Sequence, residues 1–117
     1  MREKIRDKGR LEHILEAIDK AFEFTENVSF EEYKANNMRL FAVVKCVEII
    51  GEASYKLTNE LKEQHPEVEW KKIIAMRHIL VHGYYKTEDR YVWGVVKNHL
   101  PQLKEQIKKI FEKEEFK

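Results

Sequence analysis

The sequence predicts an all-α protein, an up-and-down bundle of four or five helices that residues 1–117 form as a single domain. Two observations favour this class. Apolar residues recur at helical spacing along most of the chain, and 37% charged residues accompany only 4 Gly and 2 Pro. A high charge fraction with few helix-breaking residues is typical of helices that each keep one face in water.

The first half of the chain predicts three helices. Apolar residues at i, i+3, i+4, i+7 and i+11 indicate one over about residues 8–26. Ser29 and Glu32 have the spacing of a capping box, which would begin a short second helix. A long third helix is predicted from about Met38 to Gln64, where Pro66 ends it. The residues that carry the first pattern are Leu11, Ile14, Leu15, Ile18 and Phe22.

The second half predicts a helix from about Trp70 that stops at Gly83, since glycine readily adopts the left-handed conformation of a helix end. Residues 85–87 are expected to form a turn, with Thr87 capping a helix that reaches about His99. Pro101 should kink or restart that helix, because its ring nitrogen cannot donate a hydrogen bond.

Gly51 stands in the middle of the long predicted helix, where glycine costs about 1 kcal/mol relative to alanine. We therefore expect it to permit a close approach of two helices. Six aromatic residues at helical spacings are predicted to belong to the core: Phe22, Phe24, Phe41, Trp70, Trp93 and Phe111.

Charge and cysteine content limit the classes of function. A net charge of +1 gives no overall electrostatic footprint for nucleic acid, so any such ligand needs local positive potential in a groove or across a subunit boundary. Cys46, the only cysteine, excludes an intrachain disulfide and a thiolate zinc site. With no apolar segment of membrane-spanning length, we expect a soluble cytoplasmic protein without membrane contacts.

The segment from residue 76 to residue 85 carries the residues suited to chemistry, among them Arg77, His78, His82 and Tyr84. A histidine titrates near neutrality, so it can accept a proton from an attacking 2′-hydroxyl or donate one to a leaving oxygen. An arginine can stabilise the extra charge on a pentacoordinate phosphate. Together they are the groups that RNA cleavage without a metal requires.

On a continuous helix, Arg77 and His82 would lie about 140° apart, so they would not share a face. Either the helix opens before Gly83, or the two groups combine with those of a second copy in an isologous homodimer. Tyr84 follows Arg77 by seven residues and would be nearly eclipsed with it on such a helix. We therefore expect Tyr84 to lie beside whatever Arg77 contacts.

The pattern Arg77-x4-His82-x-Tyr84 resembles the R-x4-H-x-Y signature of the HepT-like branch of the HEPN superfamily. The resemblance covers nearly the whole chain, from about residue 10 to residue 110. It extends to flanking segments in the same order and spacing: Arg10–Ile18, Val47–Ala53, His65-Pro66, Trp70, Ile73–Arg77, Val92-Trp93 and Leu100-Pro101.

This resemblance implies a helical bundle that dimerises through the motif-bearing helices. It implies a metal-independent endoribonuclease that needs no cofactor and acts on tRNA or mRNA, with Arg77 and His82 as catalytic residues. The implied partner is an MntA-type nucleotidyltransferase antitoxin, which transfers AMP from ATP to Tyr84. His78 stands where the family commonly has Asn, and is a possible supporting residue.

Other interpretations stay open on the residues alone. Arg77 could form a salt bridge, and His82 could interact with the dipole at a helix end. His78 and His82, with Glu48 and Glu52, have the i, i+4 spacing of metal ligands, although neither Glu has a His three residues later, as the di-iron pattern requires. The alternative function is a noncatalytic helical subunit that binds a nucleotidyltransferase partner. Three histidines outside the motif are predicted to be structural or solvated: His13, His65 and His99.

Overall fold

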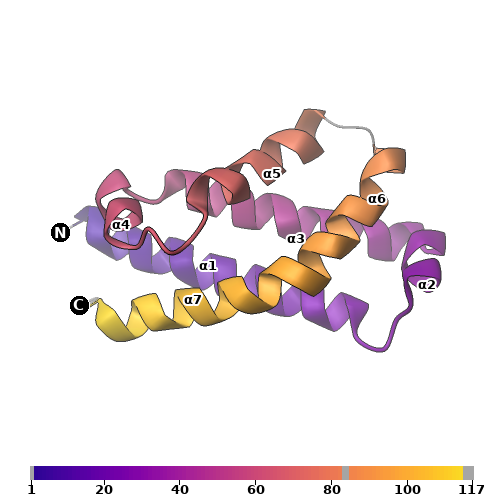
Figure 1. Ribbon diagram of the computed structural model, residues 1–117, viewed down its shortest axis with the longest axis horizontal. Coiled ribbons are helices and arrows are strands. Elements are labelled where there is room, and N and C mark those ends of the chain that lie inside the picture. Colours follow the sequence, from indigo (N-terminus) through magenta and orange to yellow (C-terminus); the bar gives the residue numbers. More distant parts are fainter. Residues whose placement is uncertain (1, 83–84, 115–117) are drawn as a thin grey trace.

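The computed structural model describes the backbone of residues 2–82 and 85–114, and the side chains of residues 6–80 and 89–114. The predicted all-α class is confirmed, and no strand occurs in these ranges (Figure 1). In chain order the elements are α1 (Arg2–Thr25), α2 (Phe30–Ala35), α3 (Asn37–Lys56), α4 (Asn59–Gln64), α5 (Trp70–His82), α6 (Tyr85–Gly94), the π-helical turn η1 (Val95–His99) and α7 (Leu100–Lys113).

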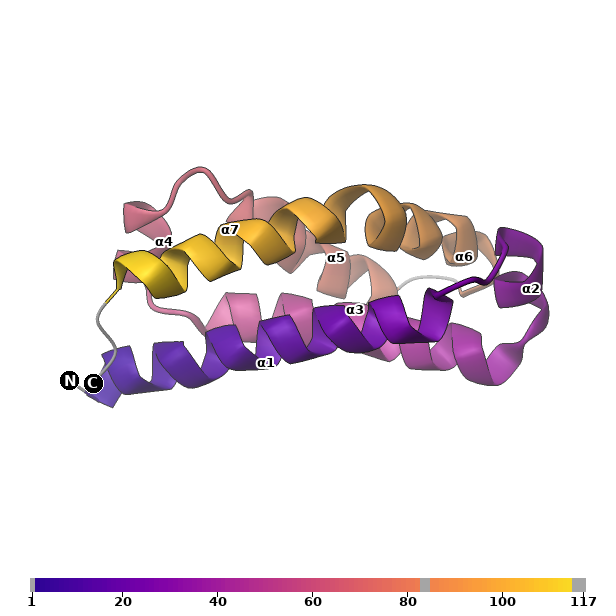
Figure 2. The same cartoon turned by 90° about the horizontal axis from the view of Figure 1, so that it is seen from below.

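Four long rods form the bundle: α1, α3, α5, and the bent rod made by α6, η1 and α7. Figure 2 shows α1 and α3 side by side, with α7 running along them and α5 and α6 on the same side as α7. α3 packs against both α1 and α5, which makes it the central element. None of the described helices is long and apolar enough to cross a membrane.

The predicted long helix from Met38 to Gln64 is wrong, because it is two helices. α3 ends at Lys56, and Thr58 caps α4 by accepting a hydrogen bond from the Leu61 amide at 3.2 Å. Asp7, buried on α1, accepts from the Thr58 amide at 3.0 Å and from its hydroxyl at 2.6 Å. A carboxylate 51 residues away therefore stabilises the break.

Of the other predicted helix ends, one is confirmed and two differ from the structure. The first helix begins at Arg2, well before the predicted residue 8. The capping box of Ser29 and Glu32 is confirmed, with both hydrogen bonds at 3.1 Å. The turn predicted over residues 85–87 is wrong: α6 begins at Tyr85, so Thr87 lies inside this helix and does not cap it. Gly83 lies outside the described residues.

Pro101 restarts the helix, as predicted. Just before it, the backbone widens into η1, where the Leu100 amide donates to the Val95 carbonyl five residues back. A proline cannot supply the amide that the carbonyl four residues earlier would accept in an α-helix. The π-turn is the local response to that missing donor.

A single cluster of buried apolar side chains from α1, α3, α5 and α7 fills the bundle. Trp70 is buried, and Phe22, Phe24, Trp93 and Phe111 are partly buried against this core, as predicted. Phe41 is not in the core: 56% of its surface is exposed on α3.

Candidate active site

Arg77 lies on the side of α5 that faces α3. Its neighbours Met76 and Leu80 are buried, whereas Arg77 itself is half-buried. A Cβ atom placed on Gly51 of α3 would lie 2.6 Å from the Arg77 Cβ and 3.1 Å from the Ile73 carbonyl oxygen. No side chain fits there, which confirms the packing role predicted for Gly51. The missing side chain brings α3 directly against the backbone that carries Arg77.

Glu52, the residue after Gly51 on α3, carries a charge close to this contact. Lys56 forms an ion pair with Glu52 at 3.2 Å. This contact is the main reason why the pKa of Glu52 lies below its ordinary value, and the positive charges of Arg77 and Lys45 lower it further. Arg77 and Glu52 are therefore close enough for their charges to interact.

The remaining motif residues are placed only in part. His78 is exposed on α5 and has interactions within the protein. His82 is the last residue of α5, but its side chain lies outside the described residues, and Tyr84 lies outside them entirely. The meeting of Arg77 with His82, and the closeness of Tyr84 to Arg77, therefore stay predictions.

Of the four possible metal ligands named from the sequence, the structure describes the side chains of Glu48, Glu52 and His78. Within the side chains that the structure describes, no three His, Cys, Asp or Glu residues are grouped so that they could hold a metal ion.

His65 has a structural role that fits its prediction. It is buried and pairs with Glu114 at 3.3 Å.

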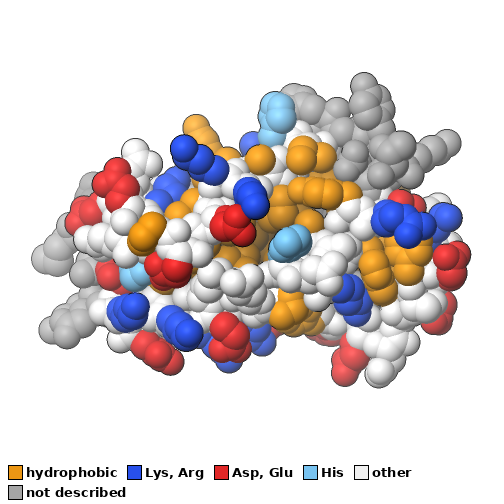
Figure 3. Space-filling view, viewed as in Figure 1, with side chains coloured by type: hydrophobic (Ala, Val, Ile, Leu, Met, Phe, Trp, Pro, Cys, Tyr) orange, Lys and Arg blue, Asp and Glu red, His pale blue; other side chains and the backbone are white. Residues whose placement is uncertain are grey.

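A groove of about 360 Å³ lies on another side of α5, between this helix and the rod of α6, η1 and α7. In Figure 3 it appears as a hollow in the hydrophobic surface near the middle of the molecule, with a histidine at its edge. Met76 and Ile79 line it from α5, and Tyr91 and His99 line it from the opposite rod. We predicted His99 to be structural or solvated, and no spacing in the sequence connected it with the motif; the structure places it in the wall of this groove.

Comparison with known proteins gives this geometry a family. The family model described as ribonuclease HepT-like matches residues 14–110, which include both α5 and the groove. The chain belongs to the ribonuclease HepT-like family. The match covers most of the chain and contains Arg77, His82 and Tyr84 in one segment.

Curated relatives of this HepT-like chain agree with the assignment. The protein named "Probable ribonuclease HepT" from Thermococcus cleftensis is 40% identical over 103 residues, which cover 88% of this chain and 94% of the relative. A relative from Methanocaldococcus jannaschii is 36% identical over 86% of this chain and 92% of its own length. Another from Caldanaerobacter subterraneus is 38% identical over 89% and 93%. The names of these last two propose RNase activity. No solved structure matches the chain significantly.

Proposed function

We propose that this protein is a metal-independent endoribonuclease, the toxin of a HepT/MntA-type toxin–antitoxin pair. The observation that carries the proposal is Arg77, held half-buried against Gly51 by helix packing inside the segment that the family model matches. An arginine whose backbone and Cβ are held in this way, on the helix that ends at His82, is suited to bind a scissile phosphate.

RNA supplies its own nucleophile. The 2′-hydroxyl oxygen attacks the adjacent phosphorus while His82 accepts its proton, and the bond from phosphorus to the 5′-oxygen breaks. A protonated histidine gives the leaving oxygen its proton, so the products are a 2′,3′-cyclic phosphate and a 5′-hydroxyl. Arg77 stabilises the charge of the pentacoordinate phosphate through two parallel N–H donors. The substrate class is tRNA or mRNA.

The proposed enzyme is a homodimer in which the α3 and α5 faces of two copies meet. Phe41 precedes Glu52 by eleven residues, so it lies about 20° from it around α3 and about 16 Å from it along the helix axis. Met38 is close to the same line. Met38 exposes 84% of its surface and Phe41 exposes 56%. Large exposed apolar side chains on the same face of α3 as Glu52 favour a protein interface along that face.

The proposed antitoxin silences the enzyme by modifying Tyr84. The phenol oxygen attacks the α-phosphorus of ATP, a bond from that oxygen to AMP forms, and pyrophosphate leaves with the phenol proton passing to solvent. The attached AMP adds phosphate charge and bulk. If Tyr84 lies near Arg77, the AMP phosphate pairs with the arginine that RNA needs.

The deciding experiment is RNA cleavage in excess EDTA by the wild type and by His82→Ala, on protein whose intact mass shows no AMP adduct. We expect the wild type to cut and the variant to be about 10²- to 10⁴-fold slower, the usual loss for a general acid or base. Equal cutting by a folded His82→Ala would refute the assigned mechanism. Absence of cutting by both, on several RNAs, would favour the noncatalytic subunit instead.

Two further variants separate the assigned roles. Arg77→Lys should cut much more slowly, because a single ammonium group cannot reproduce two-point phosphate contact. Tyr84→Phe should still cut RNA but escape silencing by a nucleotidyltransferase with ATP. Silencing of Tyr84→Phe would move the modification to another residue.

A further inference from the structure

The groove between α5 and the opposite rod is open to solvent, yet its floor is part of the hydrophobic core. Ile73, Met76 and Leu103 are at least nine-tenths buried and line it from below. Resting on the proposed ribonuclease function, we propose that this groove binds one nucleobase of the RNA and sets the base preference of cleavage.

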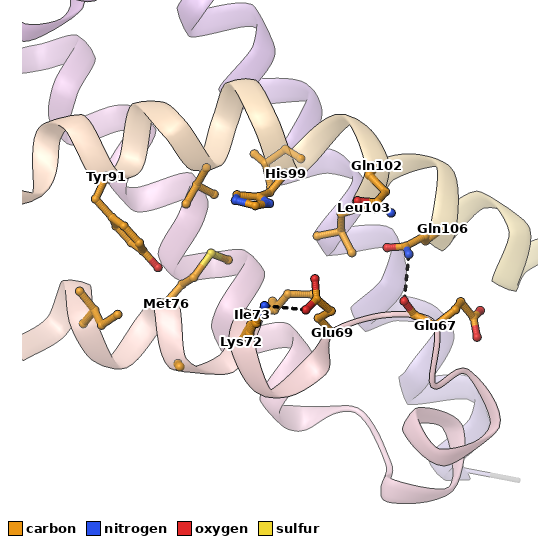
Figure 4. Close-up of a pocket in the computed structure, with 14 residues that line it drawn as sticks. Glu67, Glu69, Lys72, Ile73, Met76, Tyr91, His99, Gln102, Leu103 and Gln106 are labelled. Atoms are coloured by element: carbon orange, nitrogen blue, oxygen red, sulfur yellow. Dashed lines mark hydrogen bonds and ion pairs between the residues drawn. The ribbon is translucent and has the colours of Figure 1, made fainter.

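The shape and chemistry of the walls fit a flat heterocycle. In Figure 4, Tyr91 extends from α6 toward Met76 of α5, and His99 enters the same space from the π-turn. An aromatic ring, an imidazole and a thioether thus face a space large enough for one base. Single-stranded RNA is recognised by stacking of unpaired bases on such side chains. Widening of the backbone at η1 is a feature that often accompanies functional sites in helices.

The rim supplies the polar groups that distinguish one base from another. Gln102 and Gln106 each carry an amide with both donors and an acceptor. The Gln106 side-chain nitrogen donates to the Glu67 carbonyl at 3.1 Å, which fixes this side chain at the edge of the groove. On the α5 side, Lys72 and Glu69 form an ion pair at 2.8 Å. His99 is close enough to Glu69 to contribute to the lowering of its pKa, after the larger effect of Lys72.

The position of the groove suits a site that works with Arg77. Met76 lines the groove and is the residue next to Arg77, so the two surfaces are neighbours on one turn of α5. An RNA strand whose phosphate contacts Arg77 can turn one base across this helix turn into the groove.

A nucleobase fits this groove better than a partner protein does. The large apolar residues exposed here, Ile79 and Tyr91, each expose only 37% of their surface. A stable protein interface needs about 800 Å² on each side, and the far more exposed Met38 and Phe41 lie on α3 instead. The groove is therefore a small apolar slot with polar edges, whereas the α3 face offers the broader apolar surface.

The test is Ala75→Leu, which fills the groove from an exposed helix position without creating a cavity. Its matched control is Ala35→Leu, at an exposed position on α2 outside the groove. Each protein cuts a pool of single-stranded RNA oligonucleotides of random sequence, and the cut sites are mapped by sequencing the 5′-hydroxyl ends. Gln102→Ala and Gln106→Ala are measured as well, in case Ala75→Leu fails to fold.

We expect the wild type and Ala35→Leu to prefer one base at a fixed position beside the cut. Ala75→Leu should weaken that preference by roughly 5- to 150-fold, the range that corresponds to stacking of one base, and the glutamine variants should weaken or alter it. Uniform cutting by the wild type, or an unchanged preference in folded groove variants, would overturn the inference and leave the ribonuclease intact. Loss of dimer or antitoxin binding with an unchanged preference would also overturn it, and mark a protein contact. A wild type that cuts no RNA would overturn the proposed function itself.

Discussion

Gly51→Ala is the sharpest perturbation that the structure offers, because it adds one methyl group at the contact between α3 and Arg77. The new Cβ would lie 2.6 Å from the Arg77 Cβ, and the atoms next closest are backbone atoms of α5, at 3.1 and 3.3 Å. Carbon atoms in contact prefer about 3.5–4.0 Å. Since no flexible side-chain end can yield, α5 itself must move by about 1 Å.

The expected effects on stability partly cancel. Alanine in a helix interior is favoured over glycine by about 1 kcal/mol, whereas overpacking of a tight contact costs about 1–3 kcal/mol. The free energy of unfolding should therefore fall by about 0–2 kcal/mol, and Tm by up to about 8 °C. Catalysis should suffer far more, because a 1 Å misplacement of a catalytic group can cost about 10²-fold.

The assay is kcat/KM for RNA cleavage together with thermal unfolding of the same samples. Gly94→Ala is the matched control: it is also a helical glycine, and a Cβ there would meet only the Asn98 amide, at 3.9 Å. We expect Gly94→Ala to keep wild-type activity while Gly51→Ala loses about 10²-fold. A folded Gly51→Ala with wild-type kcat/KM would refute the argument that this contact positions Arg77 for catalysis.

Three other substitutions test separate parts of the structure. Tyr33→Phe should raise the free energy of unfolding by about 1 kcal/mol in chemical denaturation, because the buried hydroxyl, whose pKa burial raises, has no hydrogen-bond partner among the described residues. Asp7→Ala should lower it by about 2–3 kcal/mol in the same assay, since Thr58 loses both hydrogen bonds to the carboxylate. Glu52→Gln should speed RNA cleavage a few-fold at low salt by removing a negative charge near Arg77, and the gain should vanish at high salt.

Local patterns in the sequence predicted those features of the fold whose causes are local. The capping box at Ser29 lies within four residues, and the restart at Pro101 follows from one missing amide. The break between α3 and α4 could not be found in this way. Helical periodicity continues through Thr58, and the carboxylate that holds the break belongs to Asp7, near the start of α1. Tertiary contacts override a continuous helical pattern in such cases.

The candidate site also combines features that local sequence predicted with features that only tertiary packing creates. Spacing within one segment singled out Arg77, and the role of Gly51 followed from the cost of glycine in a helix, although their mutual contact needed the packing of α3 on α5. The groove was missed because its walls lie about twenty residues apart in sequence. Tyr91 and His99 meet Met76 only after the rod of α6, η1 and α7 folds back over α5.

The two proposed surfaces, the contact of Arg77 with α3 and the groove, share α5. One substitution can disturb both of them and another only the groove, so the two proposals can be tested separately. Arg77 faces α3 and its neighbour Met76 faces the groove, so a shift of α5 forced by an alanine at position 51 moves both. Gly51→Ala should therefore lower the cleavage rate and also weaken the base preference. A leucine at Ala75 fills only the groove and leaves the contact with α3 intact, so the preference should fall more than the rate. If both variants lowered only the rate, the groove would have no part in choosing the base, even if Arg77 were correctly assigned.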